Sequence, residues 1–325
     1  MTSLLVSARG LHFGSGMILA GVVAFRWLVL LPAFAGEAEE TWQSFVPLFR
    51  KLNALFLGSG VVLVISGLVW FGAVGAGMSG GSFTESLVGE TARTVLFQTR
   101  FGSVSQWRLG FAVVLAVMMA RLAWSRWLMR REMSGLERAA GWVAAALVVS
   151  VAWTGHAAAG GGPDFKWRVL ADATHLLAAS IWPAGLLPFA LLLGCARRVD
   201  DRSCLRPAVA AVRRFSSVSL MTVGVLITSG IVNACFIVGS FTALVATDYG
   251  RLLCLKLFLF LSILGFAAWN RYRLVPLLSA RAVAPDGTFM LPLFRGLQRF
   301  VLIELSLAAA VLFVVGMLGI TPPPQ

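Results

Sequence analysis

The sequence predicts an all-α, polytopic integral membrane protein with eight transmembrane helices in two parallel four-helix repeats. Three observations predict this class. Apolar residues make up 58% of the 325 residues and charged residues only 13%, whereas a soluble domain carries roughly 25% charged residues. Eight apolar runs approach or exceed the roughly 20 residues that a helix needs to cross a bilayer. Arginines cluster in alternate connections between these runs.

The eight runs are expected to be helical because hydrocarbon offers no hydrogen-bonding partners to free backbone groups. They lie at about 4–34, 52–76, 106–128, 139–158, 167–194, 213–239, 250–269 and 298–319. The first run ends in Ala33-Phe34-Ala35, which resembles a signal-peptidase site. Because this run is long and carries His12 and Arg26, we expect a retained first helix. The chain outside the runs is too short for a soluble domain of any size.

The distribution of basic residues predicts the orientation. The fourth connection holds only Lys166 and Arg168, whereas the third, fifth and seventh connections are rich in arginine. These arginines are Arg121, Arg126, Arg130, Arg131 and Arg138, then Arg197, Arg198, Arg202, Arg206, Arg213 and Arg214, then Arg271, Arg273, Arg281 and Arg295. By the positive-inside rule the odd connections are cytoplasmic. We therefore expect both termini to lie outside the cytoplasm, which means in the periplasm if the host is Gram-negative.

The same distribution limits the classes of partner. The net charge of +13 belongs to short connections, so it indicates topology and contact with anionic lipid, and no nucleic-acid partner is expected. The sequence contains no GxxxxGK[ST], HExxH or GxSxG motif. We therefore expect neither ATP-driven transport nor hydrolytic chemistry.

An internal duplication pairs the first four runs with the last four. The second run, "FRKLNALFLGSGVVLVISGLVW", and the sixth, "VRRFSSVSLMTVGVLITSGIVN", place a basic pair at the same interval before a Ser-Gly pair. The third run opens with "TRFG" and the seventh with "TDYG", and a cation follows each glycine six residues later, Arg108 or Lys256. The fourth and eighth runs share an Arg-to-Gly spacing of 17 residues. We expect two halves, residues 1–160 and 161–325, related by an axis along the membrane normal.

The duplication also relates the histidines, of which the chain has three. His12 is followed by "GVVAF" and His175 by "GLLPF", which makes them equivalent positions in the first and fifth runs. His156 has Met317 as its counterpart in the eighth run. In the predicted topology all three histidines lie in the outer half of the membrane, where polar side chains usually face a cavity, a partner or a bound species.

These positions predict a copper site. A neutral imidazole ligates a transition metal through one ring nitrogen while an acceptor fixes the other. Asp172 precedes His175 by three residues, on the same helix face, and is the candidate acceptor. Methionine is a soft ligand suited to Cu(I), and imidazole suits copper generally. The predicted ligands are His12, His156 and His175, with Met317 or Met17 nearby.

Two other roles stay open for these histidines. Two of them on facing helices are candidate axial ligands of b-type haem, and Arg108 and Lys256 are then candidate contacts for propionates or quinone. With haem the protein would be an oxidoreductase; otherwise binding or transport is expected rather than catalysis. In the remaining role each histidine is structural and only forms a hydrogen bond to a neighbouring helix. Glu304, in the eighth run, is a candidate partner of an arginine or carrier of protons.

Several separated segments resemble the copper resistance protein D (CopD) family of bacterial inner-membrane proteins. They are "YGRLLCLKLFLFLSILGFAAWNRYRLVP", the end "FVLIELSLAAAVLFVVGMLGITPPP", "GHAA" followed by "DATHLLAASIWPAGLLP", and the opening "RGLHFGSGMILAG". The resemblance covers nearly the whole chain and is densest after about residue 151. Their agreement in order makes the family assignment specific.

The resemblance implies a polytopic protein of copper handling, linked to a periplasmic copper-binding partner of the CopC type. Because no soluble domain is expected in this chain, that partner would be a separate protein. The histidines of the family carry over onto His12, His156 and His175. Copper movement across the inner membrane is the activity that the family implies, and haem-linked redox activity is the alternative.

Overall fold

A computed structural model describes residues 2–124, 131–155, 162–199, 202–283 and 290–324. These residues form helices and connecting segments and contain no strand. Among the described residues, eight helical segments are long and apolar enough to cross a membrane. The predicted all-α, polytopic membrane fold is therefore confirmed.

The eight spans differ in continuity, and three of them change helix type along their length. They are α1 (Thr2–Phe25) continued by the π-helical η1 (Arg26–Leu30) and α2 (Leu31–Ala33); α4 (Val46–Ser79); α7 (Arg100–Trp124); α8 (Gly135–Val149) continued by the 3₁₀ turn η3 (Ser150–Trp153); α9 (Phe165–Ile181) with α10 (Leu186–Ala196); α11 (Arg206–Ile237); α13 (Asp248–Trp269) continued by the π-helical η6 (Asn270–Leu274) and α14 (Val275–Val283); and α15 (Met290–Leu318). Short helices α3 (Glu39–Ser44), α5 (Phe83–Leu87), α6 (Gly89–Gln98), η5 (Arg202–Leu205) and α12 (Phe241–Ala246) lie in the connections.

Several helices are longer than their apolar runs. The sixth helix begins at Arg206 rather than about residue 213, and the eighth at Met290 rather than about 298. Hydropathy detects only the part of a helix that suits hydrocarbon. The helix itself continues into the polar interface, because its backbone groups stay hydrogen-bonded within it whatever its side chains face.

The fifth span is interrupted where one continuous run was predicted. Helix α9 ends at Ile181 and α10 begins at Leu186, with Pro183 in the turn between them. Proline has no backbone N–H to continue the helix. A side chain at Gly185 would overlap the carbonyl oxygen of Ile181, so only glycine fits the turn. The interruption lies inside the molecule, since Trp182 is fully buried.

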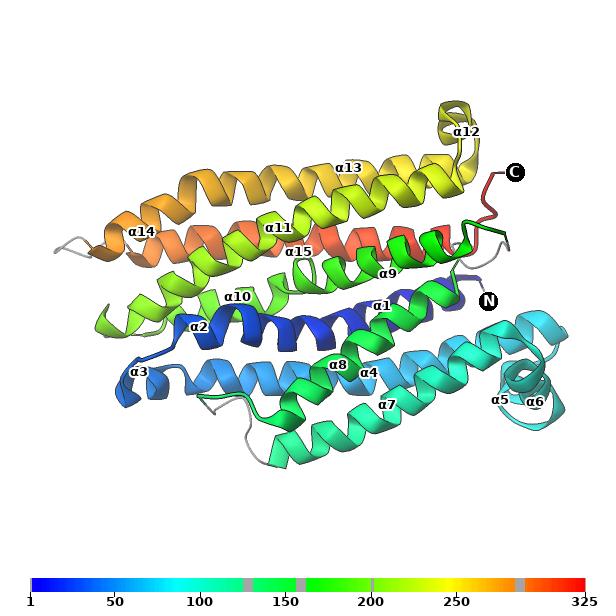
Figure 1. The fold of residues 1–325 in the computed structure, drawn as a ribbon, viewed down its shortest axis with the longest axis horizontal. Helices are drawn as coiled ribbons and strands as arrows, with labels where there is room; N and C mark the ends of the chain where they lie inside the picture. The colour runs from blue at the N-terminus through cyan, green and yellow to red at the C-terminus, as the bar shows by residue number, and fades with distance from the viewer. Residues whose placement is uncertain (1, 125–130, 156–161, 200–201, 284–289, 325) are drawn as a thin grey trace.

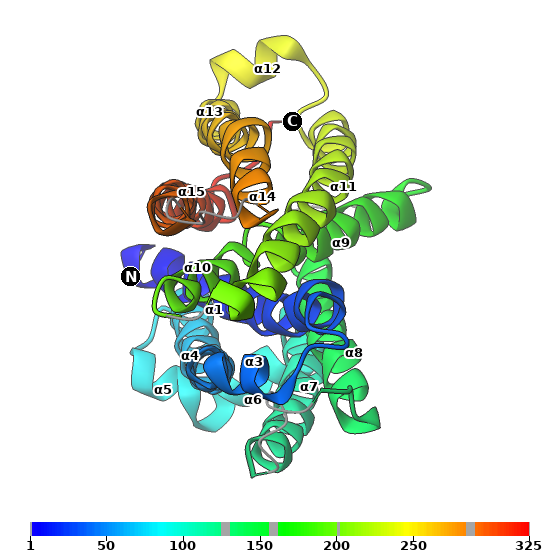
Figure 2. The same ribbon diagram turned by 90° about the vertical axis from the view of Figure 1, so that its left-hand side faces the viewer.

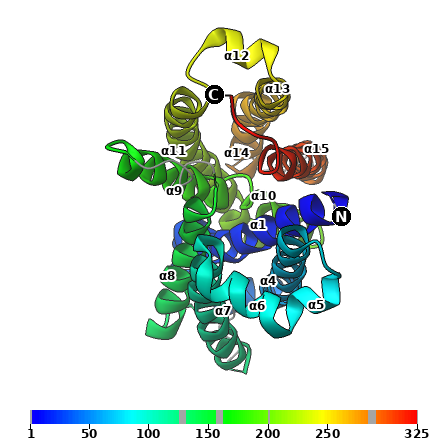
Figure 3. The same ribbon diagram turned by 90° about the vertical axis from the view of Figure 1, so that its right-hand side faces the viewer.

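Helix α1 occupies the centre of the bundle, seen end-on in Figures 2 and 3. It packs against α4 and α8, and also against α9 and α15. Close approach is possible because Gly21 faces the backbone of Ser180, at 2.6 Å from where its Cβ would be. By contrast, α13 presents exposed Phe258 and Leu261 outward. Such a surface suits lipid rather than water.

Both termini lie at the same end of the bundle, on the right in Figure 1, together with α5, α6 and α12. An even number of spans places them there. The arginine-rich connections lie at the opposite end of the bundle, and the expected orientation of the termini rests on them.

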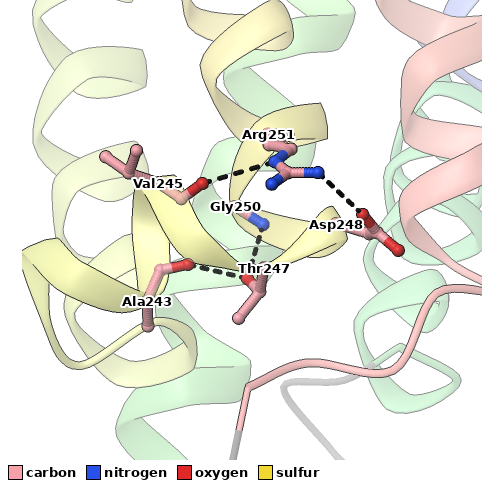
Figure 4. Close-up of polar contacts among 6 residues, drawn as sticks. All are labelled: Ala243, Val245, Thr247, Asp248, Gly250 and Arg251. Atoms are coloured by element: carbon pink, nitrogen blue, oxygen red, sulfur yellow. Dashed lines mark hydrogen bonds and ion pairs between the residues drawn. The ribbon is translucent and has the colours of Figure 1, made fainter.

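The start of α13 is built around a threonine. The Thr247 hydroxyl donates to the carbonyl oxygen of Ala243 at 2.7 Å and accepts from the backbone N–H of Gly250 at 3.0 Å (Figure 4). This caps the helix directly after α12. Gly250 is required there because a Cβ would overlap the backbone of α12 at Leu244.

The start of α7 has the same construction. The Thr99 hydroxyl donates to the carbonyl oxygen of Val95 at 2.6 Å and accepts from the N–H of Gly102 at 2.9 Å. A Cβ on Gly102 would overlap the backbone of α6. The contacts thus match at the residues that the "TRFG" and "TDYG" motifs align.

Candidate functional site

His12 is held by α4, the second span. Its Nδ1 lies 3.0 Å from the carbonyl oxygen of Leu63 and 3.5 Å from the hydroxyl oxygen of Ser66. That hydroxyl donates to the carbonyl oxygen of Val62 at 2.5 Å, so it can only accept from the imidazole. The His12 side chain is 8% exposed.

His175 is held by α11, the sixth span, in the same way. Its Nδ1 lies 3.0 Å from the hydroxyl oxygen of Ser229. That hydroxyl donates to the carbonyl oxygen of Val225 at 2.6 Å. The backbone of Leu226 also interacts with the ring. Ser229 follows His175 by 54 residues, as Ser66 follows His12.

Glycines complete both arrangements. A Cβ on Gly67 would lie 3.0 Å from Cε1 of His12, and one on Gly230 would lie 3.4 Å from Cε1 of His175. Each ring therefore rests on the bare backbone of the facing helix. The Ser-Gly pairs that revealed the duplication are the residues that hold the histidines.

These contacts determine which ring nitrogen is free. A carbonyl oxygen only accepts, and each serine hydroxyl has already donated its proton, so Nδ1–H is the donor in both rings. The neutral imidazole then carries a lone pair on Nε2, the form in which histidine ligates metals. Nε2 of His12 is buried and has no hydrogen-bond partner in the described part of the chain.

Positive charge surrounds His12. The His12 ring lies 5.6 Å from the ring of Trp70, and the guanidinium groups of Arg108 and Arg9 lie over Trp70 at 4.9 and 5.6 Å. Arg108 is 5% exposed, and its Nε and Nη2 find no acceptor among the described residues. Arg9 donates through Nη1 to the carbonyl oxygen of Gly319 at 2.7 Å. Buried N–H groups without acceptors are costly, so this region suits a ligand with acceptor atoms.

The surroundings of His175 have mixed charge. Asp172 accepts from the side-chain amide of Asn233 at 3.4 Å. It interacts electrostatically with Lys256 of α13 and with Arg9 of α1. Lys256 also acts on His175. The Nδ1 of His175 is bonded to Ser229, and a bond between His175 and Asp172 stays a prediction.

The remaining predicted ligands are dispersed. Met17 is buried in an apolar cluster with Phe13 and Trp70, and Met317 lies near the end of α15. His156 lies outside the described residues. Within the described ranges, no group of three or more His, Cys, Asp or Glu side chains is close enough to hold a metal.

Sequence reasoning missed three of these neighbours. Trp70 lies within an apolar run, and Arg9 was not considered as a site residue. Ser66 was used only to align the repeats. A signal was present, because the alignment that pairs His12 with His175 also pairs Arg9 with Asp172 and Trp70 with Asn233.

The fold and these two centres define a polytopic helical membrane protein with one histidine of each half of its sequence held against a facing helix. The family model "Copper resistance protein D-like, N-terminal domain" matches residues 1–167, and "Copper resistance protein D" matches residues 209–318. The chain belongs to the copper resistance protein D family. The resemblance noted in the sequence is thereby confirmed.

Three curated relatives are similar to the chain. Inner membrane protein YebZ of Escherichia coli (strain K12) is 29% identical over 305 residues, covering 89% of this chain and 98% of that protein. Copper resistance protein D of Pseudomonas syringae pv. tomato is 29% identical over 300 residues, covering 91% of each. Copper transport protein CutJ of Bacillus subtilis (strain 168) is 40% identical over 121 residues, 37% of this chain, which thus spans 21% of CutJ. No solved structure matches the chain.

Proposed function

We propose that this protein binds copper through His12 and His175 and takes part in moving it across the bacterial inner membrane. Membership of a copper resistance family makes copper the expected metal. The observation that carries the proposal is the orientation of both rings, which leaves Nε2 as a neutral nitrogen ligand inside the membrane. His156, Met17 and Met317 are the further ligands that we propose.

Copper would reach these ligands by exchange. Imidazole and thioether form labile bonds with Cu(I), so the ion can pass between ligand sets without nucleotide hydrolysis. We propose that it enters from the periplasm, delivered by a separate copper-binding protein of the CopC type. This requires the termini to face the periplasm, which the arginine-rich connections support because they lie at the opposite end.

We further propose that the chain consists of two four-helix halves, residues 1–160 and 161–325. The matched threonine caps of α7 and α13 support this division. So do the equal separations between each histidine and its serine. In this arrangement each half contributes one histidine centre.

A second candidate function is redox chemistry with b-type haem, and the charge around His12 favours it. Unpaired guanidinium nitrogens beside a neutral imidazole disfavour a bare metal cation. They fit a cofactor that joins a metal to carboxylates, with His12 as axial ligand and Arg9 and Arg108 on the propionates. Bound haem would supply one-electron transfer. Lys256 would play the part of Arg108 beside His175.

Transport into proteoliposomes tests the copper proposal. Wild-type protein, His12→Ala, His175→Ala and the double variant are reconstituted at equal amounts, and radiolabelled Cu(I) is added outside. We expect uptake by the wild type and loss of uptake in each histidine variant, because copper loses a ligand. Ser306→Ala, on the exposed face of α15, is the matched control and keeps wild-type uptake. Uptake by the double variant at the wild-type rate would contradict the proposal.

A further inference from the structure

A cavity of about 230 Å³ lies between α10, α11, the α13–α14 span and α15, away from both histidines. Trp182, Phe189 and Phe215 give it aromatic walls. Leu220 and Tyr272 stand at its rim, 50% and 69% exposed. Since these exposed side chains belong to membrane-spanning helices, the cavity opens toward lipid.

Polar groups converge inside this apolar cavity. Glu304 is 2% exposed and Asn270 is 6% exposed. The amide nitrogen of Asn270 donates to Oε1 of Glu304 at 2.6 Å. The amide oxygen of Asn270 and the hydroxyl of Ser219 are buried, and neither has a hydrogen-bond partner among the described residues. The cavity thus combines apolar walls with a few polar groups, as ligand sites do.

Comparison with the other buried glutamate indicates the charge state of Glu304. Glu137 of α8 is paired with Arg26 at 2.5 Å, and both side chains are fully buried. Glu304 makes no ion pair with any described cation. The nearest candidate at the cavity, Arg271, donates to Ser216 instead. An unpaired carboxylate at this depth is costly, so Glu304 is a neutral carboxylic acid with an O–H to donate.

Two irregularities of the backbone meet at the cavity. The π-helical segment η6 begins at Asn270 and turns that amide inward. The interruption between α9 and α10 begins at Trp182, which lines the opposite wall. π-helical turns and broken membrane helices are found preferentially at binding sites.

We propose that this cavity binds a membrane-soluble ring compound of the quinone or quinol class, with its polar head held by Glu304, Asn270 and Ser219. With a quinone, the O–H groups of Glu304 and Ser219 donate to the ring carbonyl oxygen; with a quinol, the Asn270 amide oxygen accepts from a ring hydroxyl. The volume is below the roughly 300–1,000 Å³ of sites that enclose a drug-sized molecule. It therefore admits one ring and leaves the tail in the lipid. The proposal does not depend on copper or haem at the histidines.

Equilibrium binding of decylubiquinone to the full-length protein in nanodiscs tests this site, with tryptophan fluorescence as the readout. We expect saturable binding that is about tenfold weaker in Glu304→Leu, which loses the O–H that donates to the quinone carbonyl, and in Asn270→Leu, which no longer holds Glu304 in place. Glu304→Gln keeps a neutral donor, so its affinity stays within about threefold of wild type. Ser306→Ala, exposed on the same helix, is the control and binds as wild type.

A cavity-filling variant separates a lost site from a damaged fold. Val223→Phe places a ring into the cavity from α11 and leaves every polar group in place, so we expect it to abolish binding. Equal affinities in wild type, Glu304→Leu and Val223→Phe would overturn the proposal. So would displacement of the quinone by phosphatidylglycerol at equal concentration, which would make the cavity a lipid site.

Discussion

The two histidine centres share a scaffold and differ in charge. In each, Nδ1 bonds to the facing helix, a serine hydroxyl accepts from it, and a glycine lies under the ring. Around His12 the neighbours are Arg9, Trp70 and Arg108. Around His175 the corresponding neighbours are Asp172, Asn233 and Lys256. The serine and glycine that orient the ring are the same in both centres, whereas the neighbouring side chains, whose charge would select a ligand, differ.

The same contrast recurs deeper in the bundle. The first half buries a charged pair, Arg26 with Glu137, and the second half buries a neutral pair, Asn270 with Glu304. In the buried ion pair the two charges neutralise each other and join helices α1–η1 and α8. A neutral pair with unused hydrogen-bonding atoms is available to a ligand. We therefore expect substitutions in the Arg26–Glu137 pair to affect stability and those in the Asn270–Glu304 pair to affect binding.

The largest expected effect is a difference in stability between variants of the two buried pairs. Glu137→Gln removes the carboxylate charge that is paired with the buried Arg26 and lowers the free energy of unfolding by about 3–5 kcal/mol. Glu304→Gln exchanges one neutral group for another and costs less than about 1 kcal/mol. Denaturant unfolding of both variants in the same detergent measures the difference. Equal losses of stability would mean that Glu304 is ionised.

A smaller effect distinguishes the two serines. Ser229→Ala removes the hydroxyl that lies 3.0 Å from the His175 Nδ1, leaves only the backbone interaction with Leu226, and should weaken metal binding at that ring by about 10- to 100-fold. Ser66→Ala should have a lesser effect, because Leu63 already accepts from His12 at 3.0 Å. Competition with a Cu(I) chelator measures both affinities. A larger loss of Cu(I) affinity in Ser66→Ala than in Ser229→Ala would contradict this assignment of acceptors to the two Nδ1–H groups.

The two glycines provide a third test. Gly67→Ala places a methyl group 3.0 Å from the His12 ring, so the ring must shift, at a cost of about 1 kcal/mol or more. Gly230→Ala meets the His175 ring at an ordinary contact distance of 3.4 Å. It should be neutral or slightly stabilising, since alanine favours a helix. Thermal unfolding of the two variants side by side checks this order.

The smallest expected effect concerns the cation of the second half. Lys256 is half-buried and repels metal at His175 only weakly, so Lys256→Met should tighten copper binding by about threefold. Arg108→Met removes a fully buried charge and should tighten copper binding at His12 more. If both substitutions weaken binding instead, the ligand carries negative charge, as haem does.

Much of the fold could be predicted because lipid imposes strict rules. Apolar runs and arginine clusters give the eight spans, and the Ser-Gly alignment relates His12 to His175. What escaped prediction depends on contacts between helices. The break at Pro183 lies in an otherwise apolar run, and the π-helical segments start at Arg26 and Asn270, whose partners lie on distant helices.

The candidate site was predictable only in part, for a related reason. The residue types that ligate metal are visible in the sequence, but the acceptor of the His12 Nδ1–H is the backbone carbonyl of Leu63. Any residue could supply such a carbonyl, so no pattern of side chains reveals it. Asp172, the predicted acceptor for His175, accepts from Asn233, while the Ser229 hydroxyl accepts from the His175 Nδ1–H. Sequence therefore gives the candidate ligands, and packing gives the nitrogen that is free to bind.

The central claim is that His12 and His175 present Nε2 to a bound metal. The most direct test is metal analysis, together with a visible absorption spectrum, of the detergent-purified wild type beside His12→Ala, His175→Ala and the double variant. We predict bound copper that falls in each single variant and is lost in the double variant. A Soret band that disappears with the same histidines would replace copper by haem at these nitrogens. Metal and spectrum unchanged in the double variant would contradict the account.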